Sequence, residues 1–394
     1  MPDWRDISVW RRLADTPEAV AAAARVDPRD AAAIARLRRS FDADLVSAAL
    51  ELAEARRKAV GKIDGAERLW CDVAGVEQSS GTPVARWKAA RMREALGAGA
   101  TILDICCGIG GDTVALAEAG LAATAVDLDA RRAWMAGVNA GCGTQVQDAE
   151  SIDPTGLVLH ADPARRDERG GTRSWSLDDH RPGRAWIERA LRGARAAAVK
   201  FSPGVDRRAF GAIPIEWEFI EARGALVQAV AWTGAFAHAA GSTRATRIAE
   251  RVETVAGAPD DARVDRIGVA AALPAGHFLS EPCAALERAQ LLTEIAGGLA
   301  REVARGLGLV VSDAPLQGAW FESFEIVDEC AAREDAIRAA LAEHGLRARS
   351  VRVRGRAVDA DALTRALGAR PDGNAVVFAF RRGERASVVV TRVH

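Results

Sequence analysis

Residues 102–112 read ILDICCGIGGD, a mostly apolar run that leads into a turn containing Gly108, Gly110 and Gly111. The run predicts a buried strand, and the residues that follow, 113–119, predict a helix. Glycine lets the backbone approach a ligand closely and adopt positive φ, and a helix N-terminus offers free N–H groups. The stretch therefore predicts either a ligand-binding strand–turn–helix unit or a tight turn without a ligand.

Short apolar runs alternate with helical patterns after residue 100, which is typical of a parallel sheet. Strands are predicted at 100–105, 122–126, 144–147, 157–160, 196–201, 215–220 and 226–232, and helices at 113–119, 130–140 and 185–193. Only a short turn, Arg223-Gly224, separates the last two strands. We therefore expect an α/β fold with a seven-stranded sheet that ends in an antiparallel hairpin.

Two regions with other patterns flank the sheet region. Residues 1–97 are predicted to be helical at 17–25, 27–39, 42–57 and 84–96, with helix starts at Asp15-Thr16-Pro17 and Asp27-Pro28 and a break at 77–83. Residues 246–394 are predicted to form an α+β module with strands at 266–273, 348–353, 375–380 and 386–393 and helices at 283–305, 334–344 and 360–367. Three domains are expected, at 1–97, 98–245 and 246–394.

Acidic residues after the strands indicate what the glycine turn binds. A dinucleotide fingerprint needs G-x-G-x-x-G, but its last position counted from Gly108 is Thr113, so a cofactor without a pyrophosphate fits better. A ligand with a carboxylate and an adenosine would suit the site. Asp127 ends the second strand, where a carboxylate can accept hydrogen bonds from both ribose hydroxyls. Asp129 is expected to cap the next helix. Asp148, after the third strand, either reaches an adenine amino group or is a solvated turn residue.

The fourth strand runs into the sequence HADPARR, residues 160–166. Ligands of such sheets lie at the C-terminal ends of the strands, so Asp162 is expected to border the same ligand unless Asp162-Pro163 is only a turn. A carboxylate and a neighbouring carbonyl at this place suit an amine, because they accept its N–H bonds and leave the nitrogen lone pair free. The predicted contribution is chiefly one of positioning.

These residues resemble bacterial class I methyltransferases that carry a C-terminal THUMP-like domain, and more distantly trimethylguanosine synthase, an RNA cap guanine methyltransferase. The likeness is carried by residues 104–112, 125–129 and 162–166, and it extends to 57–59, 77–80, 199–204, 279–282 and 390–393. It implies a Rossmann-like methyltransferase sheet, S-adenosylmethionine as the cofactor, and an RNA substrate such as tRNA or rRNA.

The resemblance also implies roles for individual residues. Asp162 and Pro163 would form the catalytic methyl-acceptor site. The cofactor would be bound by Asp104, Cys106, Gly108, Gly110, Gly111, Asp127, Leu128 and Asp148. Amine methyltransferases usually continue the Asp-Pro motif with proline and an aromatic residue that stacks on the base, but this chain has Ala164 and Arg165 there. Stacking is therefore expected from Trp175, Phe201 or the guanidinium of Arg165.

Charge indicates a polyanionic partner only locally, because the whole chain has a net charge of −1. Residues 161–210 contain 12 basic and 7 acidic residues, and residues 346–394 contain 11 basic and 4 acidic ones. Arg352 and Arg354, together with Arg356, would project from one face of a regular strand and meet phosphates, unless they form a solvated face in an arginine-rich chain. Arg165 and Arg166 are further candidates for substrate contacts.

Other features narrow the class of protein. The six cysteines lack metal-ligand spacing, the N-terminus lacks the pattern of a signal peptide, and the longest uncharged run, 224–243, is too polar for a membrane span. A cytoplasmic protein without metal is expected. Three functions stay open: methylation of an exocyclic base amine (guanine or adenine) in RNA, methylation of a small molecule or protein, and RNA binding by a methyltransferase fold without turnover.

Overall fold

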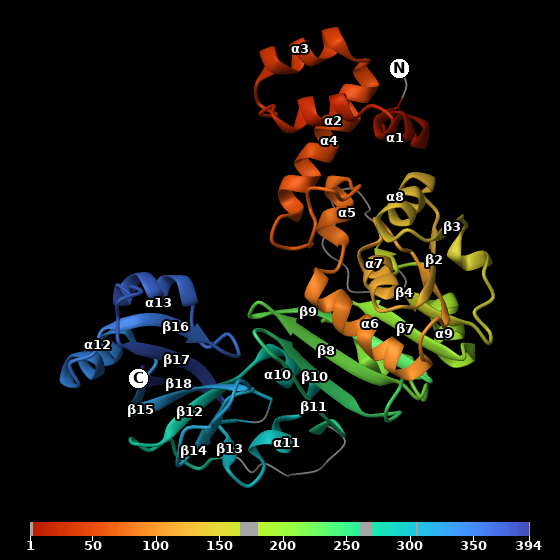
Figure 1. Ribbon diagram of the computed structural model, residues 1–394. Coiled ribbons are helices and arrows are strands. Elements are labelled where there is room, and N and C mark those ends of the chain that lie inside the picture. Colours follow the sequence, from red (N-terminus) through yellow and green to blue (C-terminus); the bar gives the residue numbers. More distant parts are fainter. Residues whose placement is uncertain (1–2, 166–179, 261–269, 305, 394) are drawn as a thin grey trace. The chain divides into compact units, whose positions relative to one another are not determined.

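The computed structural model describes residues 3–165, 180–260, 270–304 and 306–393 (Figure 1). The chain divides into two compact units, one made of Met1–Ala222 and Val227–Gly241 and the other of Arg223–Leu226 and Ser242–His394. The three-domain division stays a prediction. Among the described residues, no helix is long and apolar enough to cross a membrane.

The first unit is built on a sheet that contains the seven strands predicted from the sequence. They are β1 (Thr101–Ile105), β2 (Ala122–Asp127), β3 (Gly143–Val146), β4 (Val158–Ala161), β7 (Ala196–Phe201), β8 (Glu216–Ala222) and β9 (Ala225–Gly234). Within this unit they follow the order β3-β2-β1-β4-β7-β9-β8. The pairs from β3 to β7 are parallel and the pair of β7 with β9 is antiparallel, which confirms the expected α/β fold class.

The register of the parallel strands brings the predicted site segments to one edge of the sheet. Ile105, the last residue of β1, lies opposite Val126 on β2 and Ala161 on β4. Because parallel strands point the same way, the residues that follow these positions emerge side by side. The glycine turn, Asp127 and Asp162 are therefore neighbours, although the sequence separates them by up to 60 residues.

Three predicted helices of the sheet region are confirmed as α7 (Gly111–Glu118), α8 (Ala130–Ala140) and α9 (Arg184–Gly193). Asp129 caps α8 as expected, since its side chain accepts a hydrogen bond from the Arg131 N–H at 2.9 Å. Gly141, in the left-handed region at φ 62°, ends α8. Between β4 and α9 the chain forms a short antiparallel ribbon of β5 (Ala164–Arg165) and β6 (His180–Arg181).

The N-terminal region is helical, as predicted. It contains α1 (Ile7–Ala14), α2 (Pro17–Ala24), α3 (Ala31–Ser40), α4 (Ala43–Ala59), α5 (Val73–Gln78) and α6 (Thr82–Leu96). The start predicted at Asp27-Pro28 is wrong, because Asp27 accepts from the Arg29 N–H within a turn and Asp30 caps α3. The predicted break at 77–83 is partly wrong as well, since α5 includes residues 77 and 78. Helices α1, α2, α4 and α5 share a buried core with Met135 of α8.

The second unit contains the hairpin of β10 (Thr243–Ile248) and β11 (Val252–Gly257) and a seven-stranded sheet. The sheet order is β13 (Ala300–Glu302), β14 (Val310–Ser312), β12 (Phe278–Pro282), β15 (Phe321–Ala331), β18 (Arg385–Arg392), β17 (Ala375–Arg382) and β16 (Ala348–Val353). Helices α12 (Glu334–Glu343) and α13 (Ala360–Leu367) occur where they were predicted. This unit is the expected α+β module.

The long helix predicted at 283–305 is wrong. The segment instead forms two short helices, α10 (Ala284–Ala289) and α11 (Leu292–Ala296), and then strand β13. Gln290 ends α10 in the left-handed region at φ 57°, and Gly297-Gly298 follows α11. The strand predicted at 266–273 falls mostly outside the described residues, and its described part, 270–273, is not a strand.

Candidate functional site

A cavity of about 920 Å³ lies at the edge of the first unit's sheet where β1, β2 and β4 end. Its volume is within the range of roughly 300–1,000 Å³ that small-molecule sites occupy. The lining comes mainly from the glycine turn, the ends of neighbouring strands and the end of α5. It consists of residues 75, 77–80, 104–109, 111–112, 126–129, 132, 147–150, 162–164, 180–182, 200–203 and 227. The cavity therefore collects most of the predicted site segments.

The glycine turn is held in a conformation that larger residues would disturb. Gly108 and Gly110 have φ values of 55° and 86°, and Cys106, just before them, has φ 59°. A Cβ built on Gly110 would lie 2.7 Å from the Ala136 Cα, so α7 and α8 approach each other closely there. A Cβ on Gly108 would meet no protein atom within 4 Å. The turn is thus packed tightly on one side and open on the other.

Asp127 lies beside this turn and is tied to it. Its carboxylate accepts hydrogen bonds from the backbone N–H groups of Gly108 and Asp129, each at 2.9 Å. Burial raises the pKa of Asp127 above its ordinary value, against the lowering effect of those two hydrogen bonds. Leu128, which also lines the cavity, is 61% exposed and offers an apolar surface next to the carboxylate.

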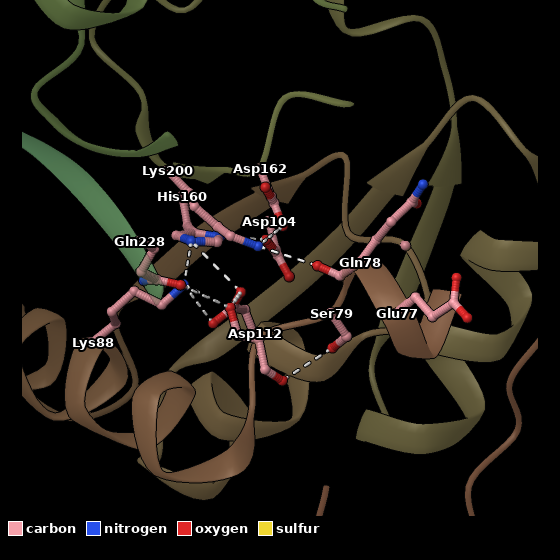
Figure 2. A network of polar contacts seen from close by, with 12 residues as sticks. Glu77, Gln78, Ser79, Lys88, Asp104, Asp112, His160, Asp162, Lys200 and Gln228 are labelled. Atoms are coloured by element: carbon pink, nitrogen blue, oxygen red, sulfur yellow. Dashed lines mark hydrogen bonds and ion pairs between the residues drawn. The ribbon is translucent and has the colours of Figure 1, made fainter. Parts of the chain in front are cut away.

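Two other predicted carboxylates have local roles in the structure. Asp148 lines the cavity and accepts from the Glu150 N–H at 2.9 Å, so it also caps the short helix that follows β3. Asp104 is fully buried, and its two carboxylate oxygens contact Thr113 Oγ1 and, at 2.7 Å, His160 Nδ1. The Asp104 side chain is therefore already satisfied by the protein beneath the turn (Figure 2).

A buried polar network continues from Asp104 and was not expected from the sequence. Lys88 Nζ, on α6, lies 3.2 Å from His160 Nε2 and 2.7 Å from the carboxylate of Asp112 (Figure 2). Ser80 Oγ also donates a hydrogen bond to Asp112, at 3.0 Å. Burial alone would raise the pKa of Asp112, but Lys88 and His160 hold it below the ordinary value. The network fixes the first turn of α7 against α6.

Asp162 extends from β4 into the cavity, and its backbone N–H donates to the Ile105 carbonyl at 3.0 Å. Its carboxylate forms an ion pair with Lys200 at 2.6 Å, and Lys200 also donates to the Gln78 carbonyl at 3.3 Å (Figure 2). Burial alone would lower the pKa of Lys200, but Asp162 and Asp112 raise it above the ordinary value. Pro163 is buried beside this pair and lines the cavity.

Of the residues near β4 and β7 that were expected to contact the substrate, Phe201 lines the cavity, and most of the others lie outside the described residues. Phe201 lines the cavity but is only 3% exposed, because Phe210 and Trp217 pack on its ring at 5.4 and 5.5 Å between centroids. The backbone of Arg165 pairs with His180. The side chain of Arg165, and all of Arg166 and Trp175, lie outside the described part of the chain.

Arg352 and Arg354 belong to the second unit and bind acidic residues there. Arg352 contacts Glu281 and lies 2.7 Å from Glu322, while Arg354 lies 2.7 Å from Glu281 and 3.4 Å from Glu287. Arg356 was expected on the same strand face, but β16 ends at Val353 and Arg356 has φ 49°. Phosphate binding by Arg352 and Arg354 would therefore have to compete with these ion pairs.

A family described as THUMP domain-like matches residues 321–392. An uncharacterized S-adenosylmethionine-dependent methyltransferase of Mycobacterium tuberculosis is 31% identical over 340 residues, which cover 80% of this chain and 88% of the relative. A solved structure of a Porphyromonas gingivalis protein assigned as a methyltransferase has a TM-score of 0.75 at 16% identity, covering 95% of this chain and 98% of that one.

The identity with the mycobacterial relative is high enough to assign this chain to its family, and the Porphyromonas structure has a similar fold. The chain belongs to the S-adenosylmethionine-dependent methyltransferases, with a THUMP-like domain at its C-terminus. It is an enzyme whose cofactor is S-adenosylmethionine, as the resemblance implied.

The cavity fits this cofactor on its own evidence. Gly108 opens onto space that a Cβ would occupy, Asp127 presents a carboxylate that can accept from ribose hydroxyls, and Leu128 presents an exposed apolar side chain for a flat ring. We propose that these three residues hold the adenosine part, with Asp148 near its amino group. No group of three or more metal-binding side chains occurs among the residues that the structure describes.

The raised pKa of Asp127 predicts an acid-sensitive affinity for the cofactor. Ribose hydroxyls donate to the ionised carboxylate, so binding weakens as the pH falls through the pKa of Asp127, at a higher pH than for an ordinary aspartate. Calorimetric titration with S-adenosylhomocysteine between about pH 7 and about pH 4 is expected to show a Kd that rises as the pH falls. In Asp127→Asn, affinity is expected to be lower and nearly independent of pH. A wild-type Kd that stays constant over this range would contradict the assignment.

Proposed function

We propose that this methyltransferase transfers a methyl group to an exocyclic amine of guanine or adenine in RNA. The position of Asp162 carries the proposal, because its carboxylate lines the same cavity as Gly108 and Asp127. The Asp162 side chain is 28% exposed, so an acceptor that enters the cavity can reach it.

The chemistry asked of the protein is mainly one of orientation. Bound S-adenosylmethionine supplies a methyl group on a positively charged sulfur, which keeps the electron pair of the broken S–C bond. Asp162 accepts an N–H hydrogen bond from the acceptor amine and thereby directs the nitrogen lone pair toward the cofactor side of the cavity. The nitrogen forms the new C–N bond and loses one proton to water. Pro163 follows directly and contributes its carbonyl group to the same edge.

The choice of RNA rests on two features. The segment 321–392 matches a THUMP-like family, which the resemblance associates with RNA substrates. Residues 161–210, directly beyond the proposed acceptor site, carry a net charge of +5. A local excess of positive charge favours a polyanion. The proposed partner is therefore an RNA such as tRNA or rRNA.

The cysteines near the cavity argue against methylation of a pyrimidine carbon, which needs a nucleophilic thiolate. Cys106 and Cys107 line the cavity. Burial, together with the charges of Asp127 and Asp104, raises the pKa values of both thiols well above the ordinary range. Both thiols stay protonated near neutral pH and are poor nucleophiles.

Label transfer tests the proposal. Incubating the enzyme with methyl-labelled S-adenosylmethionine and total RNA from cells without this gene is expected to label the RNA. Asp162→Ala is expected to reduce the rate by about 10²-fold, because the acceptor is no longer oriented. Asp64→Ala, which removes a half-exposed partner of Arg86 outside the cavity, serves as the matched control. Cofactor binding by calorimetry shows that each variant is folded. An unlabelled RNA pool with the wild-type enzyme would rule out an RNA substrate.

A further inference from the structure

Lysine is rare in this chain, and all of its lysines contact the same short segment, residues 77–80. The sequence contains 53 lysine and arginine residues, of which only four are lysine. Each of the four contacts residues 77–80, the end of α5 and the turn after it, here called the 77–80 wall. Lys58 Nζ lies 2.8 Å from Glu77 Oε1, Lys62 Nζ 3.0 Å from the Glu77 carbonyl, Lys88 Nζ 3.3 Å from Ser80 Oγ, and Lys200 Nζ 3.3 Å from the Gln78 carbonyl.

The type of contact explains why lysine is found there. Lys62 and Lys200 donate to backbone carbonyls, and Lys88 lies in a buried space between Ser80 and Asp112. A compact ammonium group with three donors suits such points, whereas the planar guanidinium of arginine needs a wider, forked arrangement. Lys62 and Lys200 therefore fix the backbone of the 77–80 wall, whereas Lys58 and Lys88 bind side chains of it.

The wall belongs to the cavity. Residues 77–80 all line it, and Ser79 packs against the glycine turn so closely that a Cβ on Gly111 would lie 2.1 Å from Ser79 Oγ. Lys200 differs from the other three lysines because it also pairs with Asp162, at 2.6 Å. The ammonium group of Lys200 thus contacts both Gln78 of the wall and the Asp162 carboxylate, two residues that line the cavity (Figure 2).

We propose that Lys200 is a positioning residue for methyl transfer, which fixes Asp162 relative to the 77–80 wall so that the acceptor is held between them. The inference rests on the proposed function, in which Asp162 holds the acceptor amine. Lys200 leaves the Asp162 side chain 28% exposed, so an acceptor in the cavity can still reach it. Its own raised pKa keeps it an ammonium ion, which has no lone pair and is not itself a methyl acceptor.

The test compares Lys200→Met and Lys200→Arg with Lys58→Met. Lys58 is the matched control, because it binds the exposed side chain of Glu77 rather than the wall's backbone and does not line the cavity. In Lys200→Met, kcat for label transfer to RNA is expected to fall by about 10²-fold while the Kd of S-adenosylhomocysteine stays unchanged. Lys200→Arg keeps a cation beside Asp162 but in a different shape, so it is expected to restore part of kcat.

A second measurement does not depend on the acceptor. Amide hydrogen exchange followed by mass spectrometry is expected to accelerate at residues 77–80 and at Asp162 in Lys200→Met, but not at Asp162 in Lys58→Met. If the wild-type enzyme labels no RNA, the proposed function fails, and exchange alone then decides this inference. The inference is overturned by an unchanged kcat, by an equal loss of cofactor affinity, by unchanged exchange at Asp162, or by a methyl group found on Lys200.

Discussion

Replacing Lys88 by methionine is expected to lower the free energy of unfolding by about 3–5 kcal/mol, the usual cost of leaving a buried charge without its partner. Lys88 is 1% exposed and pairs with Asp112 at 2.7 Å. Methionine keeps most of the volume of the side chain and removes only the ammonium group. Chemical denaturation measured by circular dichroism gives the difference. The matched control is Arg86→Met on the same helix, whose ion pairs are half exposed and contribute about 1 kcal/mol or less.

The pH dependence separates the charge effect from lost packing. Because the pKa of Asp112 is lowered in the folded state, the ion pair contributes stability above the ordinary aspartate pKa, and this contribution is lost as the pH falls through the lower value. In Lys88→Met, the buried Asp112 keeps its hydrogen bond from Ser80 but loses its nearest cation, and it destabilises the fold mainly while it is ionised. The stability gap between wild type and variant is therefore expected to narrow between about pH 7 and about pH 4. A gap that is constant over this range would show that packing alone is responsible.

Gly110→Ala is expected to lower the free energy of unfolding by roughly 2–5 kcal/mol and to abolish measurable cofactor binding. Part of this cost is the left-handed conformation at φ 86°, about 1–2 kcal/mol for a residue with a Cβ. The rest comes from overpacking, about 1–3 kcal/mol, because the new Cβ would lie 2.7 Å from the Ala136 Cα. Relief of this clash must move α7 or the glycine turn. The turn contains the Gly108 N–H that donates to Asp127, so its movement would disturb the cofactor site.

Gly141→Ala is the control for this variant. Gly141 also has a left-handed backbone, at φ 62°, but a Cβ there would meet no atom within 4 Å. The control is expected to show the conformational cost alone and to bind S-adenosylhomocysteine like the wild type. Thermal denaturation and calorimetry measure both properties. Equal effects of the two variants would mean that the contact between α7 and α8 does not shape the cofactor turn.

Much of the first unit could be predicted from the sequence, because its signals are local. The strands β1, β2, β4 and β7 are short apolar runs, and glycine or aspartate marks the turn that follows each of them. Only glycine adopts the backbone of Gly110 without strain, so the turn after β1 is visible in the residue types themselves. The same reasoning failed at 283–305, where Gln290 adopts a left-handed conformation that its residue type did not reveal.

The site was predicted less completely than the fold. Asp127 and Asp162 were expected at the cavity because they directly follow strands. Lys88 and Lys200 were not assigned roles, because their partners lie far away in the sequence. The composition could have pointed to them. In a chain whose basic residues are nearly all arginine, the four lysines stand out as positions where an ammonium group is used in place of a guanidinium.

The sequence by itself determined the order of strands and helices, the glycine turn and the placement of carboxylates at strand ends, because periodicity and turn chemistry act over a few residues. The tertiary structure alone decided which charged side chains are already bound to other residues of the protein. Asp104 binds His160 and Thr113 below the turn, and Arg352 pairs with Glu281, 71 residues away. Such pairings depend on how distant segments are brought together in the fold, and no local pattern in the chain specifies them.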